Sequence, residues 1–467
     1  MTQKLKILFV SSEVDPLVKT GGLADVAGSL PSALKELGHD VRVVLPEYSQ
    51  IPKKYLLDTE HIKHFQTRVG WRQKYVGINK LKLNNVTTYL VDNKYYFDRG
   101  SLYDNDDKHE QFAFFARAVL EMLPKIDFKP DIIHCHDWET GSISLMLKDN
   151  YYQYDFYQDI KTVFTIHNLR YQGQFSPEIL HDVLGVDEWH WDSGMIRHNN
   201  AINYMKSGIM YSDIITTVSK TYAQEIKQPE FGEGLDYALR MRGNDLFGIV
   251  NGISYDNFNP ATDSRIYTNY DQENIEGKYE NKVQLQKEMG LPQDKEIPVI
   301  GFVSRLVKQK GLELITDILE ELMEEEIQFV MLGTGQSEYE HAFTEIANKY
   351  PDKMAANIKY DAELAQKIYA GIDIFLMPSL YEPCGLGQLI SMRYGTIPLV
   401  RETGGLNDTV QSYNEKTGEG NGFSFVPFNS RDLLYTINRA LYFYKQTEVW
   451  ETLVKRAMRQ DFSWEHS

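Results

Sequence analysis

Short runs of almost wholly apolar residues alternate with segments of helical periodicity along most of this chain. Such runs are typical of strands that are buried on both faces, and helices are the usual connections between the strands of a parallel sheet. The pattern therefore predicts an α/β fold with doubly wound parallel sheets. The predicted strands lie at residues 6–13, 41–45, 131–138, 162–168 and 213–219, then from 299 onward and at 329–333, 374–378 and 397–400.

The series is interrupted over residues 251–263, where Asn, Pro and Asp are frequent and no periodicity is present. We interpret this segment as a linker between two Rossmann-like domains, one over residues 1–250 and one over 264–467. A length of 467 residues fits two domains better than one core. Within the first domain, residues 61–97 alternate apolar and polar positions and predict hairpin strands.

The overall charge and the cysteine content argue against several classes of protein. A net charge of −17 argues against binding to nucleic acid or to an anionic membrane through bulk charge. Two cysteines, Cys135 and Cys384, suit a reducing compartment. No run of 18 apolar residues is present, and Met1 stands shortly before the first predicted strand. We expect neither a membrane span nor a signal peptide, and we expect a cytoplasmic location.

Two cations follow the first strand of the second domain, in the turn that leads into a helix. Arg305 and Lys310 lie in the sequence Ser-Arg-Leu-Val-Lys-Gln-Lys-Gly, directly after an apolar run. Ligands of open α/β sheets bind at the carboxyl ends of the strands, so this turn is a candidate phosphate site. The alternative is a solvated basic loop, because most Lys and Arg side chains lie on the surface.

A pair of glycines occupies the corresponding position in the first domain. Lys19, Thr20, Gly21 and Gly22 separate the first predicted strand from the first predicted helix. Residues without a Cβ let backbone N–H groups approach an anion at a helix N-terminus. The loop matches neither a dinucleotide-binding G-x-G-x-x-G sequence nor a Walker A sequence. The alternative is a tight turn that needs positive φ.

A third candidate site follows the strand predicted at 374–378. Backbone N–H groups and the next helix offer a second anion site there, with Glu382 at the tip of the loop. Glu382 taken alone is also a candidate helix cap. Further along, Thr403 begins a Thr-Gly-Gly-Leu sequence, which repeats the glycine pair of the first domain. The other loop residues of this site are Cys384, Gly385, Leu386 and Gly387.

Metal binding has little support in the sequence. His134 and His136 form a His-x-His pair, but we expect the two rings to point to opposite faces of the strand, because side chains alternate along it. A third ligand is missing nearby. Asp104 and Asp106 match a D-x-D pattern, yet they stand in a polar loop and not at the end of a strand. We predict no metal and no cofactor.

Six motifs occur in order along the chain: Lys-Thr-Gly-Gly-Leu-Ala-Asp-Val, His-Asp-Trp, Thr-Ile-His-Asn-Leu-Arg-Tyr-Gln-Gly, Val-Ser-Arg-Leu-Val-Lys-Gln-Lys-Gly, Glu-Pro-Cys-Gly-Leu and Thr-Gly-Gly-Leu. Together they resemble the bacterial members of the glycogen/starch synthase family of retaining glycosyltransferases (family 5), over essentially the whole chain. The resemblance implies the GT-B architecture, with two Rossmann-like domains that face each other across a cleft. It also implies transfer of glucose from ADP-glucose to the non-reducing end of an α-1,4-glucan such as glycogen, with release of ADP and without a metal.

The family pattern implies a role for each matching residue. Arg305 and Lys310 would hold the pyrophosphate, and Glu382 would bind glucose hydroxyls and fix Lys310. His167 would lie beside the transferred glucose, and Tyr360 would stack on adenine. The residues that would contact the donor and its phosphates are Lys19, Gly21 and Gly22. The remaining matches to donor or acceptor positions are Asp25, Asp137, Asn251, Cys384, Gly385, Leu386, Gly387 and Thr403.

The chain also departs from the family pattern. Glu139 stands where the family usually has His, a change that bears on acceptor contacts, and Ser254 stands where an acid is usual. The family's helix that follows residues 462–465 and returns to the first domain is missing or shortened, so we expect weaker docking between the domains.

Three other functions stay open on the sequence. A related GT-B enzyme would use UDP-glucose or a different acceptor. A Rossmann-type oxidoreductase would need G-x-G-x-x-G with an acid about 20 residues later, and that pattern is lacking. The motif cations and Glu382 argue against a non-catalytic glucan-binding protein, but Glu139 and the shortened end keep this alternative open. The oligomeric state is not predicted.

Overall fold

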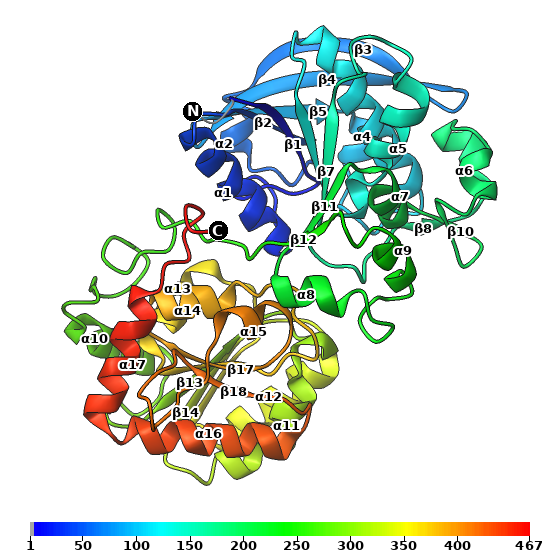
Figure 1. Cartoon of the computed structure of the whole chain (residues 1–467). Helices are drawn as coiled ribbons and strands as arrows, with labels where there is room; N and C mark the ends of the chain where they lie inside the picture. The colour runs from blue at the N-terminus through cyan, green and yellow to red at the C-terminus, as the bar shows by residue number, and fades with distance from the viewer. Residues whose placement is uncertain (1–3) are drawn as a thin grey trace. The chain divides into compact units, whose positions relative to one another are not determined.

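The computed structural model of the protein describes residues 4–467 (Figure 1). Residues 1–3, which bear on the expected lack of a signal peptide, lie outside the described part. The chain divides into two compact units. Unit 1 comprises Met1–Val218 and Ala223–Ile249, and unit 2 comprises Ser219–Tyr222 and Val250–Ser467. The segment 251–263, predicted as a linker, falls within unit 2 in this division.

Unit 1 is built on a nine-stranded sheet with the order β12-β11-β7-β6-β1-β2-β5-β4-β3. Neighbouring strands are parallel from β12 to β5, and β4 and β3 continue the edge as an antiparallel hairpin, as the alternation over 61–97 predicts. The strands are β1 (Lys6–Val10), β2 (Asp40–Pro46), β3 (Glu60–Val69), β4 (Arg72–Leu83), β5 (Val86–Asp92), β6 (Ile132–His136), β7 (Lys161–Ile166), β11 (Ile214–Thr217) and β12 (Leu246–Gly248). A separate small sheet joins β8 (Gln174–Phe175), β10 (Ala201–Asn203) and β9 (Arg197–His198).

Helices cover both faces of the large sheet of unit 1 (Figure 1). The helices of unit 1 are α1 (Gly22–Glu36), α2 (Lys53–Leu56), α3 (Lys94–Phe97), α4 (Lys108–Met122), α5 (Ser142–Met146), α6 (Trp189–Asp192), α7 (Tyr204–Tyr211) and α9 (Asp236–Met241). The short helix α8 (Lys220–Glu225) lies at the boundary of the two units.

Unit 2 contains a six-stranded, wholly parallel sheet with the order β15-β14-β13-β16-β17-β18. Its strands are β13 (Val299–Val303), β14 (Gln328–Leu332), β15 (Met354–Asn357), β16 (Ile374–Met377), β17 (Ile397–Arg401) and β18 (Phe423–Phe425). Its helices are α10 (Glu276–Glu288), α11 (Leu312–Leu322), α12 (Ser337–Lys349), α13 (Ala362–Gly371), α14 (Gly387–Arg393), α15 (Gly404–Thr409), α16 (Ser430–Tyr444) and α17 (Thr447–Arg459). The parallel strands at the centre of both sheets, with helices between them, confirm the predicted α/β class.

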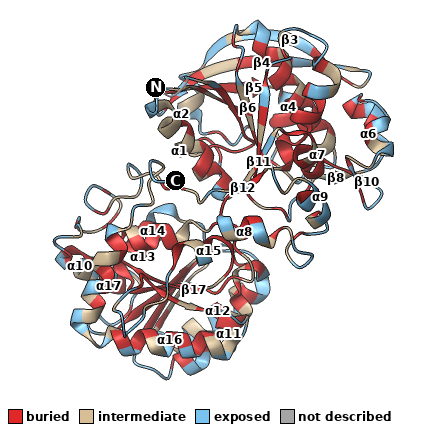
Figure 2. Ribbon diagram, viewed as in Figure 1, coloured by how far each residue is buried: buried red, intermediate tan, exposed pale blue. Residues whose placement is uncertain are grey.

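The core of each unit lies between the sheet and its helices. Leu8, Phe9 and Val10 of β1 are fully buried, as expected for a strand that is covered on both faces. In α11, residues such as Leu312, Ile315 and Leu319 recur at helical spacing and are buried against the sheet. Figure 2 shows the same contrast, with buried central strands and exposed residues on the outer helix faces. No helix within residues 4–467 is long and apolar enough to span a membrane.

The strand order reverses beside the first strand of each sheet. In unit 1, β1 lies between β2 and β6, and in unit 2, β13 lies between β14 and β16. Doubly wound sheets bind ligands at the carboxyl ends of the strands at such a point. We call the loops after β1 and β6 (residues 11–22 and 137–141) the first switch point, and those after β13 and β16 (304–311 and 378–387) the second switch point.

Candidate active site

The glycine loop of the first switch point is held by a carboxylate that the motifs do not identify. Glu13 is 4% exposed, and its Oε2 accepts hydrogen bonds from the backbone N–H groups of Thr20 and of Gly21, the latter at 3.3 Å. Its Oε1 accepts from Thr20 Oγ1 at 2.6 Å and from the hydroxyl of Tyr103 at 2.5 Å. The N–H of Gly21, which the resemblance assigns to a donor phosphate, is therefore bonded to the protein's own carboxylate.

The conformation of Gly21 does not require glycine. Its φ is −156°, in the extended region, and a Cβ built on it meets no atom within 4 Å. The alternative of a tight turn with positive φ is therefore wrong for Gly21. Gly22 is the first residue of α1, and Lys19 Nζ lies 2.5 Å from Asp25 Oδ1 on the first turn of that helix. Burial raises the pKa of Asp25, although Lys19 lowers it.

On the other side of the first switch point, Asp137 holds the backbone that follows β7. Its Oδ1 accepts the N–H of His167 at 2.7 Å and that of Asn168 at 3.4 Å. Asp137 itself adopts φ of +55°, uncommon for a residue with a side chain. Burial raises the pKa of its carboxyl to about 7, against the lowering effect of the two N–H donors. The structure thus brings Asp137 and His167 together.

His134, His136 and His167 form a row of imidazoles, and the residues His136 and His167 are buried. The ring centroids of His134 and His136 are 4.1 Å apart, and His136 Nδ1 lies 2.9 Å from His167 Nε2. The prediction that His134 and His136 point to opposite faces is wrong, because residues two apart on a strand share a face. Burial lowers the pKa of His134 to about 4 and that of His167 to about 3, so both imidazoles are neutral at neutral pH. Within residues 4–467, no group of three or more His, Cys, Asp or Glu side chains is arranged to hold a metal ion.

Glu139, the departure from the family pattern, is a buried acid. It is 5% exposed, and its Oε2 has no hydrogen-bond partner among the described residues. Burial raises its pKa well above the ordinary value, and the charge of the neighbouring Asp137 raises it further. Burial in this position therefore favours the uncharged form of Glu139.

The two cations of the second switch point have different surroundings. Lys310 Nζ lies 2.6 Å from Glu382 Oε2, and the two side chains are 15% and 8% exposed. Glu382 Oε2 also accepts the hydroxyl of Ser379 at 3.1 Å. Arg305 is exposed, and within residues 4–467 its guanidinium makes no ion pair or hydrogen bond. One cation is thus fixed by a buried carboxylate, and the other is available to a ligand.

The basic turn is fixed in place by Gly311. This residue has φ of +70°, and a Cβ built on it would lie 1.9 Å from the carbonyl oxygen of Pro378, which follows β16. The contact brings the turn after β13 against the end of β16. Lys310 thereby comes within reach of Glu382, although 72 residues separate them in sequence.

The loop that carries Glu382 does not use it as a helix cap. The residue before α14 is Leu386, and no side chain caps this helix, so the capping alternative for Glu382 is wrong. Gln388 Nε2 instead donates to the carbonyl oxygens of Cys384 at 3.1 Å and Gly385 at 2.9 Å. Gly387 begins α14, which is seven residues long.

The second glycine pair packs against this same loop. Gly405 N–H donates to the carbonyl oxygen of Glu382 at 3.1 Å. Gly404 has φ of +46°, and a Cβ built on it would lie 1.9 Å from that carbonyl oxygen. At Gly405 a Cβ would lie 2.2 Å from the carbonyl oxygen of Cys384. Thr403 is buried just before the pair, so the segment supports the loop with its backbone.

Two further predicted residues, Tyr360 and Asn251, come from other segments of unit 2, and Asn251 contacts the 378–387 loop. Tyr360 is 78% exposed just before α13, and no aromatic ring within residues 4–467 packs on it. The backbone N–H of Asn251 donates to the thiol of Cys384 and lowers its pKa, but burial is the larger effect and raises that pKa to about 12. Cys384 is therefore a buried, un-ionised thiol.

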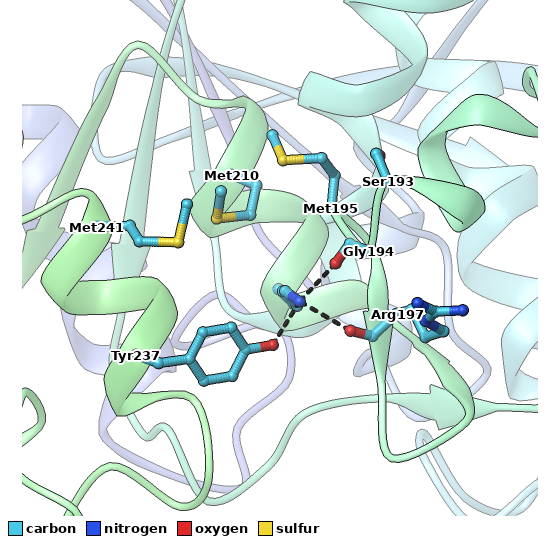
Figure 3. A pocket seen from close by; sticks show the side chains of 8 residues that line it. Ser193, Gly194, Met195, Arg197, Met210, Tyr237 and Met241 are labelled. Atoms are coloured by element: carbon cyan, nitrogen blue, oxygen red, sulfur yellow. Dashed lines mark hydrogen bonds between the residues drawn. The ribbon is translucent and has the colours of Figure 1, made fainter.

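A separate pocket of about 340 Å³ in unit 1 contains none of the predicted site residues. Figure 3 shows Met195, Met210, Met241 and Tyr237 among the residues that line it. Lys206 Nζ donates to the carbonyl oxygens of Gly194 at 2.6 Å and Arg197 at 2.7 Å and to the hydroxyl of Tyr237 at 2.5 Å. All three protons of the ammonium group are thus used, and burial lowers its pKa to about 8.

Comparisons with known proteins find matches in both units. The family model described as the starch synthase catalytic domain matches residues 6–241, and the model for glycosyl transferases group 1 matches 285–452. A protein named glycogen synthase from Clostridium novyi is 53% identical over 462 residues, which cover 99% of this chain and 96% of that one. Another of that name from Desulforamulus reducens is 52% identical, with 98% and 96% covered.

Solved structures give the same result. The catalytic domain of starch synthase IV from Arabidopsis thaliana, bound to ADP and acarbose, superimposes with a TM-score of 0.93 at 34% identity, covering 99% of this chain and 97% of that one. A sucrose-phosphate synthase from Thermosynechococcus elongatus has a TM-score of 0.63 at 17% identity, covering 99% and 96%, and supports the fold alone. The chain has the GT-B fold.

Proposed function

Because the chain belongs to the glycogen/starch synthase family of glycosyltransferases, we propose that it transfers glucose from ADP-glucose to the non-reducing end of an α-1,4-glucan, with retention of configuration at C1 and release of ADP. The glucan acceptor is supported by the name glycogen synthase that its relatives carry. ADP as the leaving group is supported by the ADP in the starch synthase IV structure. We further propose that the reaction takes place in the cytoplasm and needs no metal.

The observation that carries this proposal is the arrangement of Arg305, Lys310 and Glu382 at the second switch point. Breaking the bond between glucose C1 and the phosphate oxygen leaves growing negative charge on ADP. Positive charge that is fixed beforehand stabilises such a transition state without reorganisation. Lys310 meets this requirement because Glu382 holds it at 2.6 Å, and Arg305 is an exposed cation of the same loop after β13.

The other residues bind and orient the substrates in this proposal. His167 is uncharged at neutral pH, since burial lowers its pKa to about 3, and it serves glucose as a hydrogen-bonding group and not as a proton donor. Tyr360 offers an exposed ring face for adenine. Lys19 and Gly22 lie at the N-terminus of α1, where anions are favoured. Asp137 positions His167 through its backbone N–H.

Retention at C1 follows, in this proposal, from a front-face reaction in which the leaving oxygen and the attacking hydroxyl share one side of the sugar. Glu382 is engaged with Lys310 and Ser379, which suits a positioning role better than that of a covalent nucleophile. A glucosyl–enzyme adduct trapped on Glu382 would contradict this mechanism.

The decisive assay measures ADP release from ADP-glucose with and without glycogen, in parallel with UDP-glucose and with EDTA. We expect release that depends on glycogen, prefers ADP-glucose and is unaffected by EDTA. Release from UDP-glucose alone would move the protein to another transferase class. Binding of ADP without release from either donor would favour a non-catalytic glucan-binding protein.

A matched pair of variants tests the cations. Arg305→Ala should lower turnover by about 10²-fold or more, the usual cost of losing one preorganised donor. Lys308→Ala is the control, because Lys308 lies in the same turn with its side chain 68% exposed and a distant partner at 3.9 Å. Equal turnover in the two variants would remove Arg305 from the mechanism.

A further inference from the structure

We propose that Glu13 is a positioning residue that sets the conformation of the loop from Lys19 to Gly22 and thereby the affinity of the protein for a nucleoside diphosphate. The inference rests on the proposed function, because it takes the ligand at this loop to be the diphosphate end of the donor. None of the six motifs contains Glu13.

The first argument is the number of donors that Glu13 gathers. Four hydrogen bonds reach one carboxylate, and three of them come from the loop: Thr20 N–H, Thr20 Oγ1 at 2.6 Å and Gly21 N–H at 3.3 Å. The fourth comes from the hydroxyl of Tyr103 at 2.5 Å. Hydrogen bonds to a charged group are about twice as strong as neutral ones, so this carboxylate dominates the local energetics of an otherwise exposed loop.

The second argument is that the Glu13 carboxylate is itself rigidly placed. Glu13 is 4% exposed and follows β1 directly after Ser11 and Ser12. Ser11 Oγ donates to the carbonyl oxygen of Glu13 at 2.6 Å and accepts its N–H at 3.3 Å. Ser12 Oγ lies 3.1 Å from the hydroxyl of Tyr103, which holds the far side of the carboxylate. A fixed acceptor selects one loop conformation out of the many that a Thr-Gly-Gly sequence allows.

The third argument concerns what the loop then offers a ligand. With the N–H groups of Thr20 and Gly21 directed to Glu13, the next amide is that of Gly22, whose N–H has no partner within α1 because it begins the helix. The space around Gly21 is open, since a Cβ there meets nothing within 4 Å. Glu13 thus holds the loop so that the helix N-terminus, and not the loop itself, faces a diphosphate.

The experiment compares Glu13→Gln, Thr20→Val and wild type in two measurements. Hydrogen exchange of the peptide that spans residues 14–24 reports the loop, and calorimetric titration with ADP reports the ligand. We expect Glu13→Gln to speed exchange of the Thr20 and Gly21 amides about 10-fold and to weaken ADP binding about 10-fold, from the loss of charged hydrogen bonds. Thr20→Val, which removes one loop donor from an exposed position, should act in the same direction by about 3-fold.

The matched control is Glu110→Gln. Glu110 is also a buried acid of unit 1, 7% exposed and bonded to the hydroxyl of Tyr96, but it makes no bond to the loop. We expect it to change neither loop exchange nor ADP affinity, even if it lowers overall stability.

Unchanged loop exchange in Glu13→Gln, or tighter ADP binding by that variant, would overturn the proposal. If Glu13→Gln does not fold, Thr20→Val decides by the same two criteria. A wild-type protein that binds no ADP would overturn the proposed function, and in that case loop exchange alone decides whether Glu13 holds the loop. Unchanged Glu13→Gln affinity beside a wild type that does bind ADP overturns the role of Glu13 and leaves the function intact.

Discussion

The sequence Thr-Gly-Gly-Leu occurs at residues 20–23 of unit 1 and at 403–406 of unit 2, each time at the N-terminus of a helix. Gly21 has an extended backbone and open space where a side chain would be. Gly404 has a left-handed backbone, and a Cβ there would lie 1.9 Å from the carbonyl oxygen of Glu382. The same residue types therefore pack tightly against backbone in unit 2 and leave open space in unit 1.

The acids beside the two segments differ in the same way. Glu13 reaches the first segment through its charged carboxylate, which accepts backbone N–H groups of the loop. Glu382 reaches the second through its backbone carbonyl oxygen, while its carboxylate is engaged with Lys310. A side chain holds the loop of unit 1, and close backbone packing holds the loop of unit 2. The comparison predicts opposite responses to equivalent mutations.

The largest expected effect is that of Gly404→Ala on stability. The new Cβ collides with backbone, which cannot move aside as a side chain can, and φ of +46° disfavours any L-residue. We expect the free energy of unfolding to fall by about 4 kcal/mol. Urea unfolding measures this, with hydrogen exchange of β13 as the reporter of unit 2. An unchanged midpoint would mean that the second segment packs no more tightly than the first.

A smaller loss is expected from Glu382→Gln, and in turnover more than in stability. The amide keeps the size of the side chain but no longer fixes the ammonium group of Lys310 by charge. We expect turnover of ADP-glucose to fall about 10²-fold, as for loss of a preorganised electrostatic contact. Ser379→Ala removes one neutral donor to the same carboxylate oxygen and should cost only about 5-fold. If both variants lose activity equally, the charge of Glu382 is not what matters.

Much of this fold follows from the sequence, and the exceptions have physical reasons. All nine strands predicted from apolar runs are present, because a strand buried on both faces must be apolar throughout. The edge strands β12, β15 and β18 were missed, since runs of three or four residues are too short to show a period. The identical sequence of the two Thr-Gly-Gly-Leu segments is also misleading. Identical residues do not determine the backbone φ angle or the packing around each glycine.

The parts of the candidate site that lie within one short motif were predictable from the sequence. The contacts between residues far apart in the sequence were not. Arg305 and Lys310 stand in one turn, so their neighbourhood could be inferred from spacing. Glu13 looked like one more polar residue after a strand, and its bond to Tyr103 joins positions 90 residues apart. The sequence did contain one signal for this role of Glu13. An acid directly after a buried strand, at the first βα turn, finds its hydrogen-bond donors mainly in the loop that follows.

The acids of the two switch points should also differ in how they bind protons. Asp137 lies among acids and N–H dipoles in unit 1, and its pKa is raised to about 7 by burial, whereas Glu382 has a cation beside it. Between the ordinary carboxyl pKa and about 7, folded Asp137 holds a proton that the unfolded chain has released. Stability therefore falls as the pH rises through this window.

The test is Asp137→Asn, which keeps an acceptor oxygen for the N–H of His167 but cannot lose a proton. We expect the free energy of unfolding of the variant to rise by about 2 kcal/mol relative to wild type as the pH goes from 5 to 8. This is less than the full pKa shift would give, because buried groups relax on ionisation. The histidines with lowered pKa values also destabilise the folded protein at low pH, where they must become charged. This contribution is the same in both proteins and cancels in the difference. Parallel pH profiles for the two proteins would show that Asp137 is ionised throughout.

The smallest and most specific expectation concerns Gly21→Ala. Since φ is −156° and no atom lies within 4 Å of the added Cβ, the free energy of unfolding should change by less than about 0.5 kcal/mol. The methyl group would instead occupy the space next to the helix N-terminus that a diphosphate needs, so KM for ADP-glucose should rise about 10-fold with a smaller change in kcat. Steady-state kinetics and urea unfolding on the same preparation check both halves. A variant that loses stability but not affinity would make the first segment a packing element like the second, because the open space at Gly21 would then have no function.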